Sequence, residues 1–543
     1  MIEHTIQTMI KDALSSMNAD LESIDIEVPN DPVNGDYSTN VAMKLARVLR
    51  KAPIQIAKDI VDAFDANDTF KKIEVAPPGF INFYVNKTLY HSVIHTINTQ
   101  GSAYGDLSLG NGERWNIEYV SANPTGSLHI GHARGASHGD ALSRVLKKAG
   151  YDVTREFYVN DGGNQIHNLT LSINARYQQA FGNDAAMPSD GYHGKEIIQL
   201  AKQIKAEHGD RFLNEDGYDF FKKYGVEYLL DALRVDLSAF HVDFDVWFSE
   251  ASLYKKNAVH ETVNELKAKG FTYEEDGALW LKTTEFGDEK DRVIIKSDGS
   301  YTYITPDIAY HRDKLSRGYT KLIDILGSDH HGYVPRLKAS IAMIGGKTDL
   351  LEVDLMQMVK VIQDGEEVKM SKRSGKAITV KDLIEDVGSD PIRYFFAMRS
   401  LNTQMELDLD LALKQTNENP VYYVQYAHAR IASMLRQAQS QGIDLDLSID
   451  SFDTLNNPKI DDVLTALVEY PKVIEEAATK RIPHRVAQYI HKLASALHSF
   501  YADEKVIQDD QRATLERLAL MHAVKTVLKD ALELVGVEAK ERM

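Results

Sequence analysis

A ten-residue segment, NPTGSLHIGH from Asn123 to His132, constrains the fold of this chain more than any other part of its sequence. The strand-like NIEYVS precedes it, and the helix-like ALSRVLKKAG follows it. A strand, a glycine-containing turn and a helix make the first unit of a doubly wound nucleotide-binding fold. Gly126 and Gly131 let a ligand approach the backbone, and the start of the helix offers unpaired N–H groups. The segment therefore predicts a phosphate site.

Two histidines in this segment, His129 and His132, add side-chain donors beside the backbone N–H groups. A histidine pair at a helix start can also serve only to cap the helix or to fill a partly buried position. The complete string between a strand and a helix favours the phosphate site.

A second, basic segment, VKMSKRSGK from Val368 to Lys376, follows a predicted hairpin whose turn is Asp364-Gly365. Lysines on a glycine-containing loop can neutralise the charge that develops on a departing pyrophosphate. Taken alone, such a run is typical of a solvated surface loop. Its value as a signal depends on the first segment.

The order of predicted elements divides the chain into three parts and places it in the α/β class. Residues 1–110 combine amphipathic helices with strands around Ile73 to Val85, which predicts a small α+β module. Residues 111–387 predict a Rossmann-type doubly wound domain with a mainly helical insertion near 185–265. Residues 388–543 predict an all-helical bundle, interrupted only from Gln441 to Pro458.

Composition excludes several classes of function. The absence of cysteine removes disulfides, thiolate zinc sites, iron–sulfur clusters and cysteine nucleophiles. A net charge of −18 argues against a uniformly basic surface for nucleic acid, although a local basic groove remains compatible with it. The N-terminus lacks a signal peptide, and no apolar run is long enough to span a membrane. We therefore expect a cytoplasmic protein without membrane contact.

Together the two segments resemble the paired signatures of the class I aminoacyl-tRNA synthetases, with KMSKR in place of the more general KMSKS. Further stretches resemble the arginyl-tRNA synthetase family, among them TREFYVNDGGNQI, YITPDIAYHRDK, GSDHHGYVPR and NPVYYVQYAHARI. This resemblance implies an ATP-dependent ligase that activates L-arginine and transfers it to the terminal adenosine of its tRNA. It also implies a monomer.

The resemblance implies roles for individual residues at the ATP site. The expected catalytic residues are His129, His132, Lys369 and Lys372. The expected ATP-binding residues are Gly126, His129, Gly131, His132, Gly327, Asp329, Met370, Ser371 and Lys372. Magnesium would accompany the triphosphate without a dedicated protein cage, and no zinc is expected.

An arginine substrate needs carboxylates that can meet a planar guanidinium, with an aromatic ring or hydroxyl alongside. The resemblance implies that these residues are Glu118, Ser121, Asn123, His132, Tyr303 and Asp307. Asn123 would hold the backbone carboxylate or amine of the substrate. For Asp307 the alternative of a helix N-cap beside Pro306 stays open.

Contacts with tRNA are less readable in the sequence. Tyr422, Tyr423, Tyr426, His428 and Arg430 interleave aromatic and basic side chains on one predicted helix, which could stack on bases. Such a stripe is more typical of a core, so we expect at least the first and third of these tyrosines to be buried. The resemblance implies that the helical bundle reads the anticodon and the N-terminal module touches the elbow of the tRNA. The candidate tRNA-binding residues are Asn82, Tyr84, Tyr423 and Arg430.

Three alternatives compete with this interpretation. The cysteine enzyme of the same class usually holds zinc through thiolates, which this chain cannot supply. A small nucleotidyltransferase would leave the helical C-terminal part and the N-terminal module unexplained. An inactive paralogue kept for tRNA binding would have no need of His129, His132 and Lys372.

Overall fold

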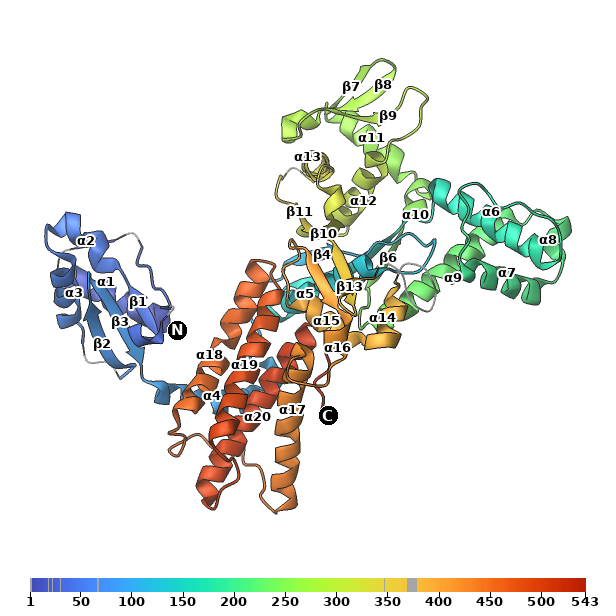
Figure 1. The fold of residues 1–543 in the computed structure, drawn as a ribbon. Helices are drawn as coiled ribbons and strands as arrows, with labels where there is room; N and C mark the ends of the chain where they lie inside the picture. Colours follow the sequence, from blue (N-terminus) through green and yellow to red (C-terminus); the bar gives the residue numbers. More distant parts are fainter. Residues whose placement is uncertain are drawn as a thin grey trace.

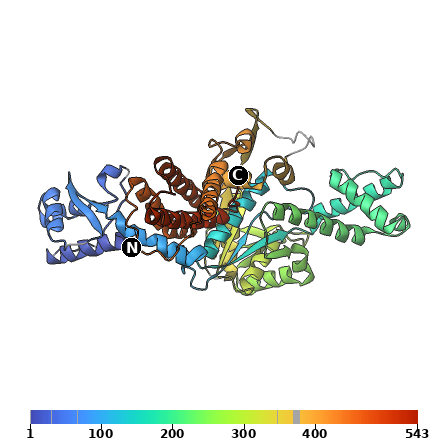
Figure 2. The same cartoon turned by 90° about the horizontal axis from the view of Figure 1, so that it is seen from below.

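The computed structural model describes residues 2–17, 19–21, 23–29, 31–65, 68–345, 347–368 and 378–543. In Figure 1 the N-terminal module stands apart at the left, a helical lobe projects at the right, and the C-terminal bundle lies between them below a central sheet. The view from below in Figure 2 places the module and the lobe at opposite ends of the molecule. No helix in the described part of the chain is long and apolar enough to cross a membrane.

The N-terminal module is built on a three-stranded antiparallel sheet in the order β1-β3-β2. Its elements are α1 (Ile2–Ser16), β1 (Tyr37–Thr39), α2 (Val41–Leu49), α3 (Pro53–Asp62), β2 (Phe70–Ala76) and β3 (Phe80–Val85). The apolar face of β3 is buried, with the Phe83 ring centroid 5.1 Å from that of Phe70. α4 (Ser92–Gln100) then leads toward the bundle.

Five parallel strands form the central sheet, in the order β11-β10-β4-β5-β6. They are β4 (Arg114–Glu118), β5 (Asp152–Val159), β6 (Val246–Ser249), β10 (Lys321–Gly327) and β11 (Leu351–Met356). From β4 the chain first builds the β5 side of the sheet and later returns to build the β10 side. The topological switch therefore lies between β4 and β10, where doubly wound sheets bind their ligands at the carboxyl ends of the strands.

Helices and a small sheet surround this core. α5 (Ile130–Lys148) follows β4, and α6 (Gly163–Ala180), α7 (Lys195–His208), α8 (Arg211–Asn214) and α9 (Tyr218–Ala239) form the projecting lobe, which has its own apolar core. The next elements are α10 (Glu250–Lys255), α11 (Ala258–Ala268), β7 (Thr272–Glu275), β8 (Ala278–Leu281), β9 (Arg292–Ile295), α12 (Ile304–Ser316) and α13 (Val334–Gly345).

The predicted hairpin is confirmed, since β12 (Val359–Gln363) pairs antiparallel with β13 (Glu366–Glu367). Its turn residues Asp364 and Gly365 both have positive φ, 55° and 77°, as a tight two-residue turn requires. One strand, β14 (Met405–Asp408), interrupts the helices predicted after residue 388, because it pairs in parallel with β12.

The remaining elements are helical, as the sequence predicted. They are α14 (Val380–Val387), α15 (Ser389–Ala397), α16 (Leu409–Leu413), α17 (Pro420–Ser440), α18 (Pro458–Thr479), α19 (His484–Asp503) and α20 (Gln511–Leu534). The irregular stretch before Pro458 was also predicted.

Candidate active site

The two histidines of the first segment cap the start of α5 through their Nδ1 atoms. His129 is the N-cap, and its Nδ1 accepts the Gly131 N–H at 3.1 Å. His132 Nδ1 accepts the His129 N–H at 3.1 Å, and the two rings stack with centroids 3.7 Å apart. Because each Nδ1 is an acceptor, each neutral ring carries its proton on Nε2. The capping interpretation is therefore correct for the two Nδ1 atoms. The two Nε2–H groups take no part in capping and can donate to a ligand.

Both rings are neutral at physiological pH in the absence of ligand. Burial lowers the pKa of His129. Burial and the neighbouring His129 lower the pKa of His132 to about 3. The pair therefore offers hydrogen bonds rather than a permanent positive charge.

Three glycines in the turn and in α5 occupy positions with different amounts of free space. A Cβ on Gly139 would lie 2.3 Å from the ring of Tyr119, so α5 can pack this closely over the end of β4 only with a glycine there. A Cβ on Gly131 would lie 3.0 Å from the His129 ring. Gly126 has nothing nearer than 4.0 Å, which leaves room for a ligand beside it.

A strained turn leaves the end of β4. Val120 and Ser121 have φ of 68° and 39°, a left-handed conformation that is rare for residues other than glycine and least favourable for a β-branched side chain. Such strain costs about 1–3 kcal/mol per residue and clusters at functional sites. The turn aims the Ser121 hydroxyl at Glu118 Oε1, 3.0 Å away, while Asn123 Nδ2 donates to Gln165 at 2.8 Å.

Charged side chains converge beneath this turn from β4, β10 and α12. Glu118 lies beside Asp324 in the register of β4 and β10. The fully buried Lys314 reaches both carboxylates, at 2.6 Å and 3.1 Å, and His311 Nε2 lies 2.8 Å from Asp324. Burial alone would lower the pKa of Lys314, but Asp324 and Glu118 raise it above its usual value. Lys314 is therefore charged and neutralises part of the acidic cluster.

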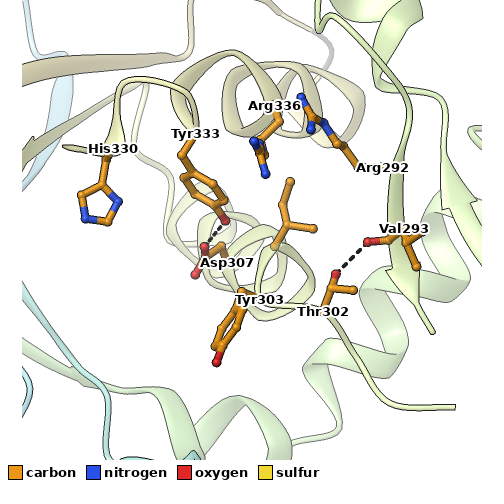
Figure 3. A pocket seen from close by; sticks show the side chains of 9 residues that line it. Arg292, Val293, Thr302, Tyr303, Asp307, His330, Tyr333 and Arg336 are labelled. Atoms are coloured by element: carbon orange, nitrogen blue, oxygen red, sulfur yellow. Dashed lines mark hydrogen bonds between the residues drawn. The ribbon is translucent and has the colours of Figure 1, made fainter. Parts of the chain in front are cut away.

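Asp307 faces a separate cavity of about 590 Å³. Figure 3 shows its carboxylate bonded to the Tyr333 hydroxyl, with two arginines across the cavity. The lining residues are Arg292, Val293, Thr302, Tyr303, Ile304, Asp307, His330, Tyr333 and Arg336. Tyr303 is 92% exposed and open to a ligand. Burial raises the pKa of Asp307 to about 6, although the bond from Tyr333 opposes this effect.

The N-cap alternative for Asp307 is excluded. α12 starts at Ile304 with Tyr303 as its N-cap residue, so Asp307 lies inside the first turn of the helix. Its carboxylate accepts a hydrogen bond from Tyr333, which directly precedes α13, instead of capping its own helix.

Gly327 and Asp329 lie where β10 ends, next to the switch point. A Cβ on Gly327 would come within 2.4 Å of Asp329 Oδ1, and the Asp329 side chain is 82% exposed. Exposed acceptors at the end of a central strand suit a sugar hydroxyl.

Lys369, Met370, Ser371 and Lys372 of the second segment lie outside the described residues. The first residue of that segment and the residues after it are hydrogen-bonded to elements already described. Val368 N–H donates to Val361 on β12 at 2.8 Å. On the other side, Val380 N–H donates to Leu128 at 2.8 Å, and Thr379 forms a β-bridge with His129. The chain thus returns to the first segment directly after the second.

The candidate tRNA residues of the N-terminal module differ in exposure. Asn82 is only 4% exposed, and its side chain accepts a bond from Ser38 Oγ at 2.8 Å. Tyr84 is partly exposed, and its hydroxyl donates to Val33 O at 2.8 Å. Tyr84 is therefore the better placed of the two for contact with a partner.

The prediction that Tyr422 and Tyr426 are buried is wrong, because both are partly exposed. They stack on each other with centroids 6.0 Å apart, since they lie one turn apart on α17. The Tyr423 ring stacks against His491 with centroids 5.2 Å apart. The Arg430 guanidinium lies 4.2 Å from the ring centroid of Tyr501. Small and aliphatic residues fill the buried face of α17 instead.

Two residues of the site, His311 and Lys314, were missed by the sequence analysis. A signal was present, because they follow Asp307 at spacings of four and seven, which is one face of a helix. No group of three or more histidine or acidic side chains that could hold a metal ion occurs among the described residues.

Comparison with protein families gives three matches along the chain. The arginyl tRNA synthetase N terminal domain matches residues 4–85, and the catalytic domain of tRNA synthetases class I (R) matches residues 94–395. The DALR anticodon binding domain matches residues 424–543.

Individual relatives agree with these matches. An arginine–tRNA ligase of Bacillus subtilis is 52% identical over 547 residues, covering 100% of this chain and 98% of the relative. The structure of a putative arginyl-tRNA synthetase from Campylobacter jejuni superposes with a TM-score of 0.78 at 36% identity, covering 84% of this chain and 100% of that one. Arginyl-tRNA synthetase from Thermus thermophilus shares the fold over the full length of both chains, with a TM-score of 0.76 at 21% identity.

Proposed function

Because the chain belongs to the arginyl-tRNA synthetase family of class I, it is an arginine–tRNA ligase, and we propose how its residues perform this reaction. The carboxylate of arginine attacks the α-phosphorus of ATP in line, and pyrophosphate leaves. A ribose hydroxyl of the terminal adenosine of tRNA then attacks the acyl carbon of the adenylate, and AMP leaves. Both steps need positioning and stabilisation of negative charge, and neither needs a protein nucleophile.

For ATP, the proposed contacts gather around the start of α5. His129 and His132 donate from Nε2 to phosphate oxygens, and the strand end at Gly327 and Asp329 holds the ribose. Gly126 and Gly131 leave space for the nucleotide. Lys369 and Lys372, with Met370 and Ser371, act on the triphosphate from the second segment. The bridge between Thr379 and His129 supports this arrangement, since it ties the chain beside that segment to the first signature.

Magnesium enters with the nucleotide in this proposal. Its ligands would be phosphate oxygens and water, since Mg²⁺ keeps most of its waters and is commonly bound through substrate phosphates.

The arginine side chain is recognised by two carboxylates whose surroundings differ. Glu118 is already paired with Lys314, whereas the Asp307 carboxylate accepts a hydrogen bond from the Tyr333 hydroxyl and has a raised pKa. Asp307 therefore gains most from an incoming guanidinium, with Tyr303 beside it. This contrast is the observation that carries the arginine assignment. Ser121, Asn123 and His132 would orient the backbone carboxylate and ammonium of the substrate.

tRNA binding is proposed for both ends of the molecule. Residues 388–543 would read the anticodon, with Tyr423 stacking on a base and Arg430 meeting a phosphate. Residues 1–110 would touch the elbow through Tyr84, with Asn82 supporting that strand, and residues 111–387 would carry the chemistry. We further propose that the protein acts as a monomer in the cytoplasm, where charged tRNA is consumed.

ATP–pyrophosphate exchange with each amino acid, with and without total tRNA, tests this function. Arginine should support exchange at a rate well above every other amino acid when tRNA is present. Exchange that favours another amino acid would overturn the arginine assignment. Exchange with arginine but without formation of arginyl-tRNA would overturn the transfer step.

A further inference from the structure

We propose that Arg134 is a positioning residue for adenylate formation, because it fixes the strands next to the basic segment against the helix that carries the two histidines. The inference rests on the proposed function of those two segments. Arg134 lies two residues after His132 on α5 and is 1% exposed.

The guanidinium of Arg134 binds four backbone carbonyls from two separate linkers. Nη1 donates to Gln357 at 2.8 Å and to Met358 at 3.4 Å. Nη2 donates to Ser400 at 2.9 Å and to Thr403 at 2.8 Å. The first linker leads into β12 and the second into β14, the two strands that pair in parallel. One side chain therefore sets where both strands start.

This arrangement is unusual in its charge. Arg134 has no ion pair with a carboxylate in the described part of the chain, and burial lowers its pKa to about 10. A buried charge without a counter-ion is costly, so the four carbonyls must offset that cost. A lysine could not replace it, because an ammonium lacks the planar fork that reaches two linkers at once.

The position of Arg134 on α5 relates these linkers to the phosphate site. Residues two apart on an α-helix point about 200° away from each other, so the clamp and His132 occupy opposite faces of α5. The next residue on α5, Gly135, lies beside Met356 at the end of β11, since a Cβ placed on it would be 3.7 Å from the Met356 sulfur. α5 thus joins the histidines rigidly to the start of β12.

From β12 the chain reaches the basic segment within a few residues. Val368 is bonded back to Val361 on β12, and after the segment Thr379 and Val380 return to Leu128 and His129. The chain on both sides of the segment is therefore connected to α5. Before the segment the connection runs through β12 and Arg134, and after it through the β-bridge between Thr379 and His129. A displacement of about 1 Å in such a frame can cost 10²-fold in rate.

The test compares Arg134→Lys with Arg144→Lys in exchange assays that contain tRNA and vary ATP and arginine separately. Arg144 is a matched control on the same helix, since it also donates to two carbonyls and to Asp140, but far from the β12 and β14 linkers. We expect Arg134→Lys to lower kcat by about 10²-fold with the arginine KM changed less than twofold. Arg144→Lys should keep kcat within about threefold.

Melting temperatures and chemical rescue complete the experiment. Arg134→Ala supplemented with millimolar guanidinium should recover kcat, while methylammonium should not. The proposal is overturned if Arg134→Lys keeps the wild-type kcat, if its defect lies in the arginine KM, or if kcat falls in step with melting temperature in both lysine variants. Failure of wild-type protein to exchange with arginine would instead refute the proposed function.

Discussion

Replacing Asp307 by asparagine should make the ligand-free protein more stable and should weaken its affinity for arginine. The folded protein raises the pKa of this carboxyl from an ordinary value of 3.8 to about 6, with burial as the main cause. A shift of this size corresponds to about 3 kcal/mol of unfavourable free energy for the charged form, and partial exposure of the side chain reduces it to about 1–2 kcal/mol.

The sign of the pH dependence follows from that shift. Below about pH 3 the carboxyl is protonated in both the folded and the unfolded chain, so Asp307→Asn should leave stability unchanged there. As the pH rises from about 4 through 6, the wild type loses stability relative to the variant, and the difference is complete above about pH 7. Urea denaturation at pH 3 and pH 8 measures it, with Asp276→Asn on the surface as the control.

Ionisation of Asp307 should also control the affinity for arginine. Raising the pH through 6 should strengthen arginine binding, whereas it lowers the stability of the ligand-free protein. With a pKa of about 6, roughly 90% of Asp307 is ionised at pH 7 and roughly 10% at pH 5. The apparent arginine KM should therefore rise about tenfold over this range, while His132, with a pKa of about 3, does not titrate. Asp307→Asn should raise the KM by about 10- to 100-fold and abolish the pH dependence. An arginine KM that is flat from pH 5 to pH 7 in the wild type would refute this reasoning.

Three further variants test other parts of the site. Lys372→Ala should lower kcat of pyrophosphate exchange by about 10²-fold with an unchanged circular dichroism spectrum; unchanged turnover would remove this lysine from the mechanism. Gly139→Ala should destabilise the protein by about 1–3 kcal/mol in urea titrations, since its Cβ would overlap the Tyr119 ring. Lys314→Met should cost about 3–5 kcal/mol by leaving Glu118 in a buried, unpaired state, and a melting temperature equal to wild type would contradict that pairing.

The sequence predicts well those features that depend on local pattern. The strand, turn and helix around His129 could be read because their residues are contiguous and because helical and strand periodicities differ. The hairpin at Asp364-Gly365 was readable for the same reason, since only a few residue pairs favour that turn. The proposal that His129 and His132 donate to phosphate rests on these local elements and stays a prediction.

Contacts between distant segments could not be read in this way. The pairing of Glu118 with Lys314 joins residues 196 positions apart and depends on how α12 packs against the sheet. The four carbonyls bound by Arg134 leave no trace in side-chain identity, because every residue has a carbonyl. The left-handed turn at Val120 was hidden for a different reason, since tertiary contacts override the preference of the residue there.

The partial exposure of Tyr422 and Tyr426 illustrates a limit of periodicity. A stripe of aromatics at helical spacing fits a core and a binding surface equally well. What separates them is whether a neighbouring helix covers the stripe. Among the described residues of α19, His491 and His498 make ring contacts with Tyr423 and Tyr426, and both tyrosines stay partly exposed.

The neutral state of His129 and His132 has a consequence for the end of the reaction. A site lined by fixed cations would attract the nucleotide strongly but would also retain the departing pyrophosphate, and turnover would slow at product release. In the proposed mechanism, uncharged imidazole donors would hold the phosphates only over hydrogen-bond distances, so this interaction would end once the leaving group moves away. The long-range attraction would then come from the lysines of the second segment, so that different residues would control capture and release.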